Sequence, residues 1–113
     1  MTLFRLYLIA WIIGISVYTS VTVAEHGLNL LPVFFGDIAV MAWPGQFNLD
    51  FFSFLCLGGL WLAWRHHFSL GGIVLGLFIF AGGMPFLATY LLLHSLRARG
   101  DMKVLLLGEG RAA

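Results

Sequence analysis

Three long apolar runs constrain this chain more than any other feature. The first extends from Leu3 to Val23 and is interrupted only by Arg5, the second extends from Phe51 to Trp64, and the third extends from Phe68 to Leu96. The second and third runs contain no formally charged residue. Because a helix needs roughly 20 apolar residues to cross the hydrocarbon core of a bilayer, we predict an integral membrane protein.

The composition agrees with this class. Hydrophobic residues make up 61% of the chain and charged residues 10%, whereas about 25% charged residues is usual in a soluble domain. The net charge of +1 and the lack of a basic patch interleaved with aromatics argue against nucleic-acid binding. The single cysteine, Cys56, lies in the second apolar run, cannot form an internal disulfide, and is interpreted as a packing or lipid-facing residue.

The predicted fold is a single all-α membrane domain over residues 1–113, with transmembrane helices at about residues 3–24, 48–65 and 70–96. A short interfacial or re-entrant helix is predicted at about residues 32–43, between Pro32 and the turn signal Trp43-Pro44-Gly45. This segment is short for a full crossing, although a fold with four transmembrane helices remains the alternative. Residues 97–113 are predicted to form a cytoplasmic tail. The first span is longer than the apolar core of a signal peptide, so we expect it to be a retained anchor.

The positive charges leave the orientation contested. With three crossings, Arg5 and Arg65 lie on one side and the four cationic residues of the tail on the other, so the positive-inside rule places the N-terminus outside. With four crossings, Arg5 joins the tail. The charge distribution fits four crossings slightly better and the segment length fits three better, but both arrangements place the C-terminus in the cytoplasm.

Glycines mark the positions where the spans are expected to pack closely. A Gly pair lies in the second span, a GxxxG spacing lies early in the third, and a second Gly pair shortly before Pro85 predicts a kink. The predicted helix-packing residues are Gly58, Gly59, Gly72, Gly76, Gly82 and Gly83.

The second span ends in a segment typical of a membrane interface. Trp61 and Trp64 are followed by Arg65, whose side chain is predicted to snorkel toward water. His66 and His67 come next and point about 100° apart on a helix, which favours contact with lipid headgroups over coordination of one ligand.

The sequence contains no complete catalytic motif, and no cofactor is firmly implied. In the three-crossing arrangement the end of the third span meets the loop after the first span, which gathers two imidazoles and three carboxylates. Such a set is able to bind zinc, iron or manganese, or to relay protons, although ordinary solvated interfacial residues are the simpler interpretation. With four crossings the set is divided. These candidate metal ligands are Glu25, His26, Asp37, Asp50 and His94.

Several stretches resemble a group of small multi-span bacterial inner-membrane proteins of unknown function. The stretches are residues 31–37 (LPVFFGD), 43–50 (WPGQFNLD), 61–65 (WLAWR), and the segment from Pro85 to Asp101. The resemblance implies a small multi-span protein of the bacterial inner membrane, and no catalytic residue is carried over from it.

Small size, glycine-lined spans and the lack of a catalytic set predict a non-catalytic accessory or assembly subunit of a larger membrane complex. Its expected partners are the lipid bilayer and either other membrane protein subunits or a second copy. The alternative is a small membrane protein with a metal-binding or proton-handling site at one membrane face.

Overall fold

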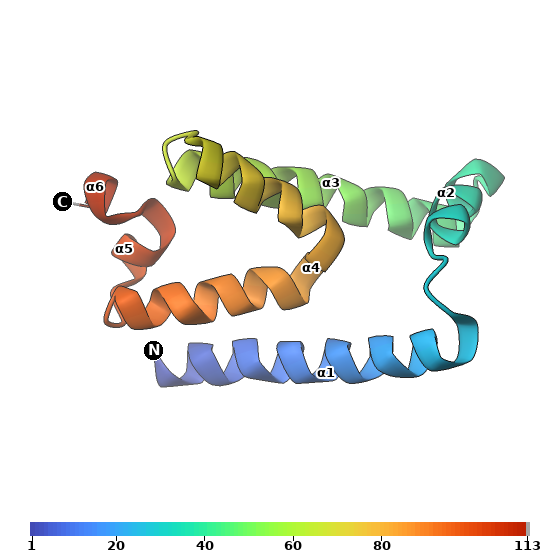
Figure 1. Ribbon diagram of the computed structural model, residues 1–113, viewed down its shortest axis with the longest axis horizontal. Helices are drawn as coiled ribbons and strands as arrows, with labels where there is room; N and C mark the ends of the chain where they lie inside the picture. Colours follow the sequence, from blue (N-terminus) through green and yellow to red (C-terminus); the bar gives the residue numbers. More distant parts are fainter. Residues whose placement is uncertain (113) are drawn as a thin grey trace.

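The computed structural model describes residues 1–112, and every regular element in this range is a helix. Three helices are long and apolar enough to cross a membrane: α1 (Thr2–His26), α3 (Trp43–Arg65) and α4 (Leu70–Arg97). The shorter helices are α2 (Leu31–Val40), α5 (Met102–Leu107) and α6 (Glu109–Ala112) (Figure 1). The predicted class, an all-α membrane protein with three long apolar helices and a short helix between the first two, is confirmed.

The connection between α2 and α3 is tighter than the sequence indicated. The segment Trp43-Pro44-Gly45, which we predicted to be a turn, forms the start of α3. Pro44 occupies the first turn of that helix, where a backbone N–H is not needed. The chain reverses instead at Met41, which has a left-handed φ of 64°. Asn48 then donates a hydrogen bond from Nδ2 to the carbonyl of Phe34 at 3.1 Å, which joins α3 to α2.

Helix α4 is broken at Gly83 and folds back on itself. Gly83 has φ 57° and ψ −142°, a conformation that glycine adopts far more readily than other residues, and Pro85 follows shortly after. A straight helix of 28 residues is about 42 Å long. Nevertheless, the Tyr90 hydroxyl lies 2.9 Å from Nη1 of Arg65, which is only five positions before the start of α4. Residues 70–82 therefore form an outgoing arm and residues 84–97 a return arm, and both ends of α4 lie at the same end of the molecule (Figure 1).

The outgoing arm packs on α3 through glycines. A Cβ at Gly76 would lie 2.6 Å from the Gly59 carbonyl oxygen, and one at Gly59 would lie 2.9 Å from the Gly76 carbonyl oxygen. A Cβ at Gly58 would lie 2.6 Å from Cδ1 of Ile79. The two helix backbones therefore touch directly, as small residues allow in membranes.

We expect Gly76→Ala to destabilise the protein by about 2 kcal/mol, because the new methyl group overlaps the Gly59 backbone and separates α3 from α4. Gly71→Ala is the matched control, since a Cβ there meets no atom within 4 Å. It should be neutral or slightly stabilising, as alanine is the better helix former. Thermal unfolding in detergent micelles measures both variants. Equal melting temperatures would contradict the close contact.

The return arm packs on the first half of α1. Leu8 is 1% exposed and is the only buried residue of α1. Arg5 donates from Nε to Oγ of Ser95 and from Nη2 to its carbonyl, each at 3.0 Å, and Ser95 is fully buried. Ser95 also bonds the carbonyl of Leu92 at 2.7 Å. These bonds fix α1 against the end of the return arm.

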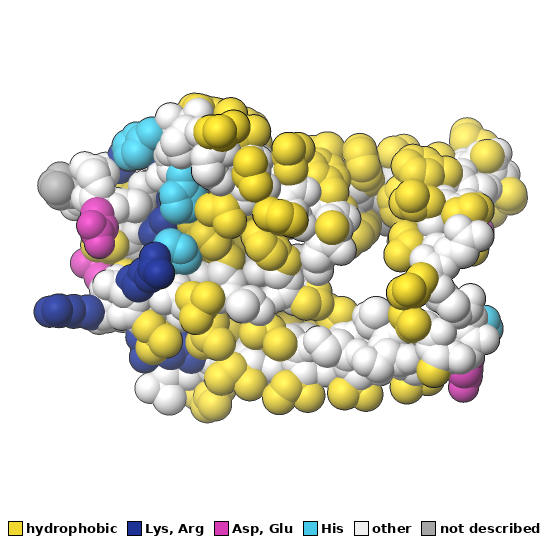
Figure 2. Space-filling view, viewed as in Figure 1, with side chains coloured by type: hydrophobic (Ala, Val, Ile, Leu, Met, Phe, Trp, Pro, Cys, Tyr) yellow, Lys and Arg dark blue, Asp and Glu magenta, His cyan; other side chains and the backbone are white. Residues whose placement is uncertain are grey.

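Folding back sorts the charges between the two ends of the molecule. Figure 2 shows the cationic side chains gathered at one end of the molecule, where α1 begins and where α5 and α6 lie. This cationic end contains all six lysines and arginines together with Asp101 and Glu109. The opposite end, here called the acidic end, contains the other three acidic residues, Glu25, Asp37 and Asp50. The residues that define the cationic end are Arg5, Arg65, Arg97, Arg99, Lys103 and Arg111.

Candidate functional site

Arg65 is the centre of the cationic end and is buried, with 8% of its surface exposed. Its Nε donates to the carbonyl of Leu105 at 2.7 Å, and its Nη2 donates to the carbonyl of Val104 at 3.3 Å. Its Nη1 donates to the hydroxyl of Tyr90 at 2.9 Å. The predicted snorkelling of Arg65 toward water is wrong, because α5 and the return arm of α4 supply three acceptors that hold the guanidinium inside.

Helices α5 and α6 cover the end of α3 as a cap. Asp101 starts α5 by accepting a hydrogen bond from the Lys103 backbone at 2.9 Å. Trp61 donates from Nε1 to the carbonyl of Leu106 at 3.1 Å. Arg111 bonds the carbonyl of Trp64, and its guanidinium lies 4.0 Å from the centre of that indole ring. The predicted C-terminal tail is therefore anchored on α3 over its described residues, and it encloses Arg65.

Tyr90 connects Arg65 to two histidines. Its hydroxyl lies 2.6 Å from Nε2 of His66, and its ring centre lies 4.1 Å from that of His94. The rings of His66 and His94 are 5.9 Å apart. The turn after α3 and the return arm thus bring together two imidazoles that are far apart in the sequence.

The electrostatic environment of His66 opposes its protonation. Burial lowers the pKa of His66 below its usual value of 6.5, and the positive charge of Arg65 and the neighbouring His67 lower it further. His66 is therefore neutral at neutral pH. In the tautomer in which Nε2 of the neutral ring accepts the Tyr90 hydroxyl hydrogen, Nδ1 carries the ring hydrogen.

These groups line a pocket of about 320 Å³ that opens at the cationic end. Its walls come from the end of α3, the end of α4, and the α5–α6 cap. Two arginines, three histidines and one glutamate are among the lining residues, which are Arg65, His66, His67, His94, Arg97, Ala98, Val104, Gly108, Glu109 and Gly110.

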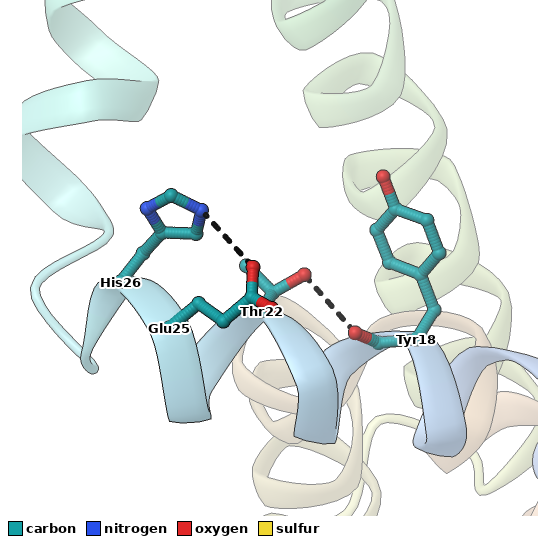
Figure 3. A network of polar contacts seen from close by, with 4 residues as sticks. All are labelled: Tyr18, Thr22, Glu25 and His26. Atoms are coloured by element: carbon teal, nitrogen blue, oxygen red, sulfur yellow. Dashed lines mark hydrogen bonds and ion pairs between the residues drawn. The ribbon is translucent and has the colours of Figure 1, made fainter.

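The structure divides the five predicted metal ligands between the two ends. Glu25 and His26 remain close, with 3.9 Å between Oε2 and Nε2, and both are exposed (Figure 3). Asp37 is half-buried on α2 and Asp50 is exposed on α3. His94 lies at the cationic end instead, because α4 folds back at Gly83 rather than crossing to the acidic end.

No group of three or more His, Cys, Asp or Glu side chains suited to a metal ion occurs within residues 1–112. The four acidic-end candidates come from three different helices, and the only ion pair among them is that of Glu25 with His26. The fold-back of α4 therefore removes the arrangement on which the metal hypothesis depended.

A second feature of the molecule is an incompletely covered stripe on α1. Its residues recur alternately four and three positions apart, which places them in one line along the helix. They are Leu8, Ile12, Ile15, Thr19, Thr22 and His26. The first three are buried or half-buried against the return arm, whereas the last three are exposed. We call these six residues the α1 seam.

The exposed half of the seam borders an opening. Figure 2 shows that, beyond the turn of α4, α1 is separated from the other long helices by a gap through the molecule. In this half, Thr22 donates its hydroxyl hydrogen to the Tyr18 carbonyl at 3.0 Å (Figure 3). Its oxygen keeps lone pairs for a further donor. Near the turn of α4, an apolar groove of about 650 Å³ runs between α3 and α4 and includes Phe51, Gly83 and Met84 in its lining.

No protein-family model matches this chain, and no curated protein or solved structure shows a significant match to it.

Proposed function

We propose that this protein is a non-catalytic accessory or assembly subunit that associates with another membrane protein through the exposed half of the α1 seam. The observation that carries the proposal is the continuity of the seam. The same stripe that packs against the return arm near Leu8 continues to Thr19 and Thr22, where no helix within residues 1–112 covers it.

The proposed occupant is an apolar helical segment of a different protein, entering from the acidic end. A helix fits better than lipid because the threonine oxygens can accept hydrogen bonds from a protein partner and cannot from acyl chains. Self-association is disfavoured by the shape of the chain. If α1 of a second copy lay in the opening parallel to α1 of the first, it would clash with the return arm. That arm already covers the half of the seam near Leu8.

The proposed location is the bacterial inner membrane with both termini in the cytoplasm. The bacterial part of this proposal rests on the sequence resemblance described above. The orientation is supported by the charges, since all six lysines and arginines lie at the cationic end. The positive-inside rule assigns such an end to the cytoplasm. With α4 folded back, both the short length of α2 and the charge distribution support this proposed orientation.

Site-specific photo-crosslinking tests the proposed partner. A photoreactive amino acid at position 19 is expected to form an adduct with a second membrane protein in native membranes. At position 17, about 200° away around the helix, the same group is expected to react with lipid. Thr22→Phe should abolish the adduct at position 19 by filling the seam, and its exposed position means that the fold is retained.

Three results would contradict the proposal. Equal adducts from positions 17 and 19 would mean that the seam is not the contact surface. An adduct of twice the chain mass would replace the accessory role with self-association. Reaction with lipid alone at both positions would leave the opening as a lipid-filled surface.

A further inference from the structure

We propose that the pocket at the cationic end binds a phosphate group at the membrane surface. The pocket is separate from the α1 seam, and this proposal does not depend on the accessory role. Its central groups are Arg65, His66, His94 and Arg97, which come from the ends of α3 and α4.

Arg65 carries a buried positive charge at the wall of the pocket. A guanidinium has five N–H donors, and three of those of Arg65 are directed at the neutral oxygens of Leu105, Val104 and Tyr90. No Asp or Glu side chain within residues 1–112 forms an ion pair with it. A buried charge is normally paired, because removing it from water is costly. The remaining donors and the positive charge of Arg65 therefore favour an anion in the pocket that it lines.

The other hydrogen-bond donors of the pocket come from different helices. Nε2 of His66 lies 2.6 Å from the Tyr90 hydroxyl, and in the tautomer that accepts from Tyr90 there, Nδ1–H is a donor. His94 and the exposed Arg97 come from another helix, so the donors surround the pocket from different sides. A tetrahedral phosphate presents acceptors in several directions and carries more charge than a carboxylate, which suits such a set. Among the described lining residues, Glu109 is the only one with a carboxylate side chain, against two arginines.

The pocket lies beside residues typical of a membrane interface. Trp61 and Trp64 lie in the last turn and a half of α3, and tryptophan side chains are enriched at the headgroup level. Basic pockets between helices on the cytoplasmic side of membrane proteins bind phosphate-bearing headgroups. A volume of about 320 Å³ is at the small end of the range for ligand sites, which fits a headgroup rather than a whole lipid. The phosphate belongs either to an anionic phospholipid or to a soluble phosphate compound.

Binding measurements on the full chain in a neutral detergent distinguish these sources. One arm titrates short-chain phosphatidic acid and the other titrates inorganic phosphate. Saturable binding of the lipid alone identifies a headgroup site, whereas binding of both identifies a general phosphate site. No saturable binding in either arm would overturn the proposal.

Two charge-removing variants provide the specificity test. Arg97→Gln, at the exposed rim of the pocket, should weaken binding by about tenfold through loss of a charged hydrogen bond. Lys103→Gln removes the same charge from the same end of the molecule but does not line the pocket, and it should change binding by less than about twofold. If both variants weakened phosphate binding equally, the binding would be a general attraction to the basic surface. That result would overturn the proposed pocket site.

A second readout does not require any substitution. The groups that face His66 are Arg65, His67, Tyr90, His94, Arg97 and Glu109. A bound phosphate adds negative charge to this set and should raise the pKa of His66, as measured by NMR titration of its ring. Binding should correspondingly become tighter as the pH falls through that pKa. An unchanged pKa at saturating phosphate would place the anion elsewhere.

Discussion

A cysteine introduced in place of Leu70 is expected to react from the same side of the membrane as one in place of Lys103. A cysteine in place of Leu28 is expected to react from the opposite side. The physical reason is the break at Gly83, which returns α4 to the end where it began. All three positions are exposed, so labelling does not require unfolding. The result is all-or-none, and impermeant thiol reagents applied to oriented vesicles measure it on a Cys56→Ala background.

A further position makes the labelling test complete. Met41 is 88% exposed at the acidic end and should label with Leu28. Labelling of the Leu70 and Lys103 positions from opposite sides would mean that α4 crosses the membrane as one span. The side that labels Lys103 should be the cytoplasmic one, according to the charge distribution.

The sequence predicts the helices of this protein well because span length is a local property. The length of each apolar run can be compared directly with the thickness of a bilayer. Apart from the start of α3, the ends of α1, α3 and α4 lie close to the predicted ones. The largest difference is at Trp43-Pro44-Gly45. Proline and glycine favour both turns and first turns of helices, and the contact of α2 with α3 decides between them here.

The direction of α4 after its kink could not be predicted from sequence. Gly82, Gly83 and Pro85 predict a break, and a break is present. The angle, however, depends on contacts made far along the chain, such as those of Arg5 with Ser95 and of Arg65 with Tyr90. The predicted grouping of His94 with Glu25 required α4 to cross the membrane without folding back. In the structure the two residues lie at opposite ends of the molecule.

The pocket was missed for the same reason. Arg65 beside Trp64 has the local pattern of a snorkelling cation, and that pattern contains no information about acceptors 25 to 40 residues later in the chain. The available signal was the apolar patch of Val104 to Leu107 in the supposed tail. Its Leu105 is fully buried, and a hydrophobic patch after a polar turn is a reasonable sign of a segment that packs back on the protein.

Arg65→Met is expected to destabilise the protein by about 3 kcal/mol and to release the α5–α6 cap. Methionine retains the apolar stem but removes the donors to the carbonyls of Leu105 and Val104 and to the Tyr90 hydroxyl. Leaving buried acceptors without donors costs about 1–3 kcal/mol each, offset in part by no longer burying a charge.

Release of the cap can be measured locally by proteolysis and globally by the melting temperature. Trypsin should cleave at Lys103 in Arg65→Met under conditions where the parent chain resists, and the melting temperature in detergent should fall. Arg99→Met is the matched control, since Arg99 is exposed in the turn before α5, and surface changes of this kind usually stay within about 0.5 kcal/mol. If both variants melt and digest alike, then water rather than Arg65 satisfies the α5 carbonyls. If Arg65→Met alone opens the cap, one buried guanidinium both holds the C-terminal helices in place and maintains the positive pocket that they enclose.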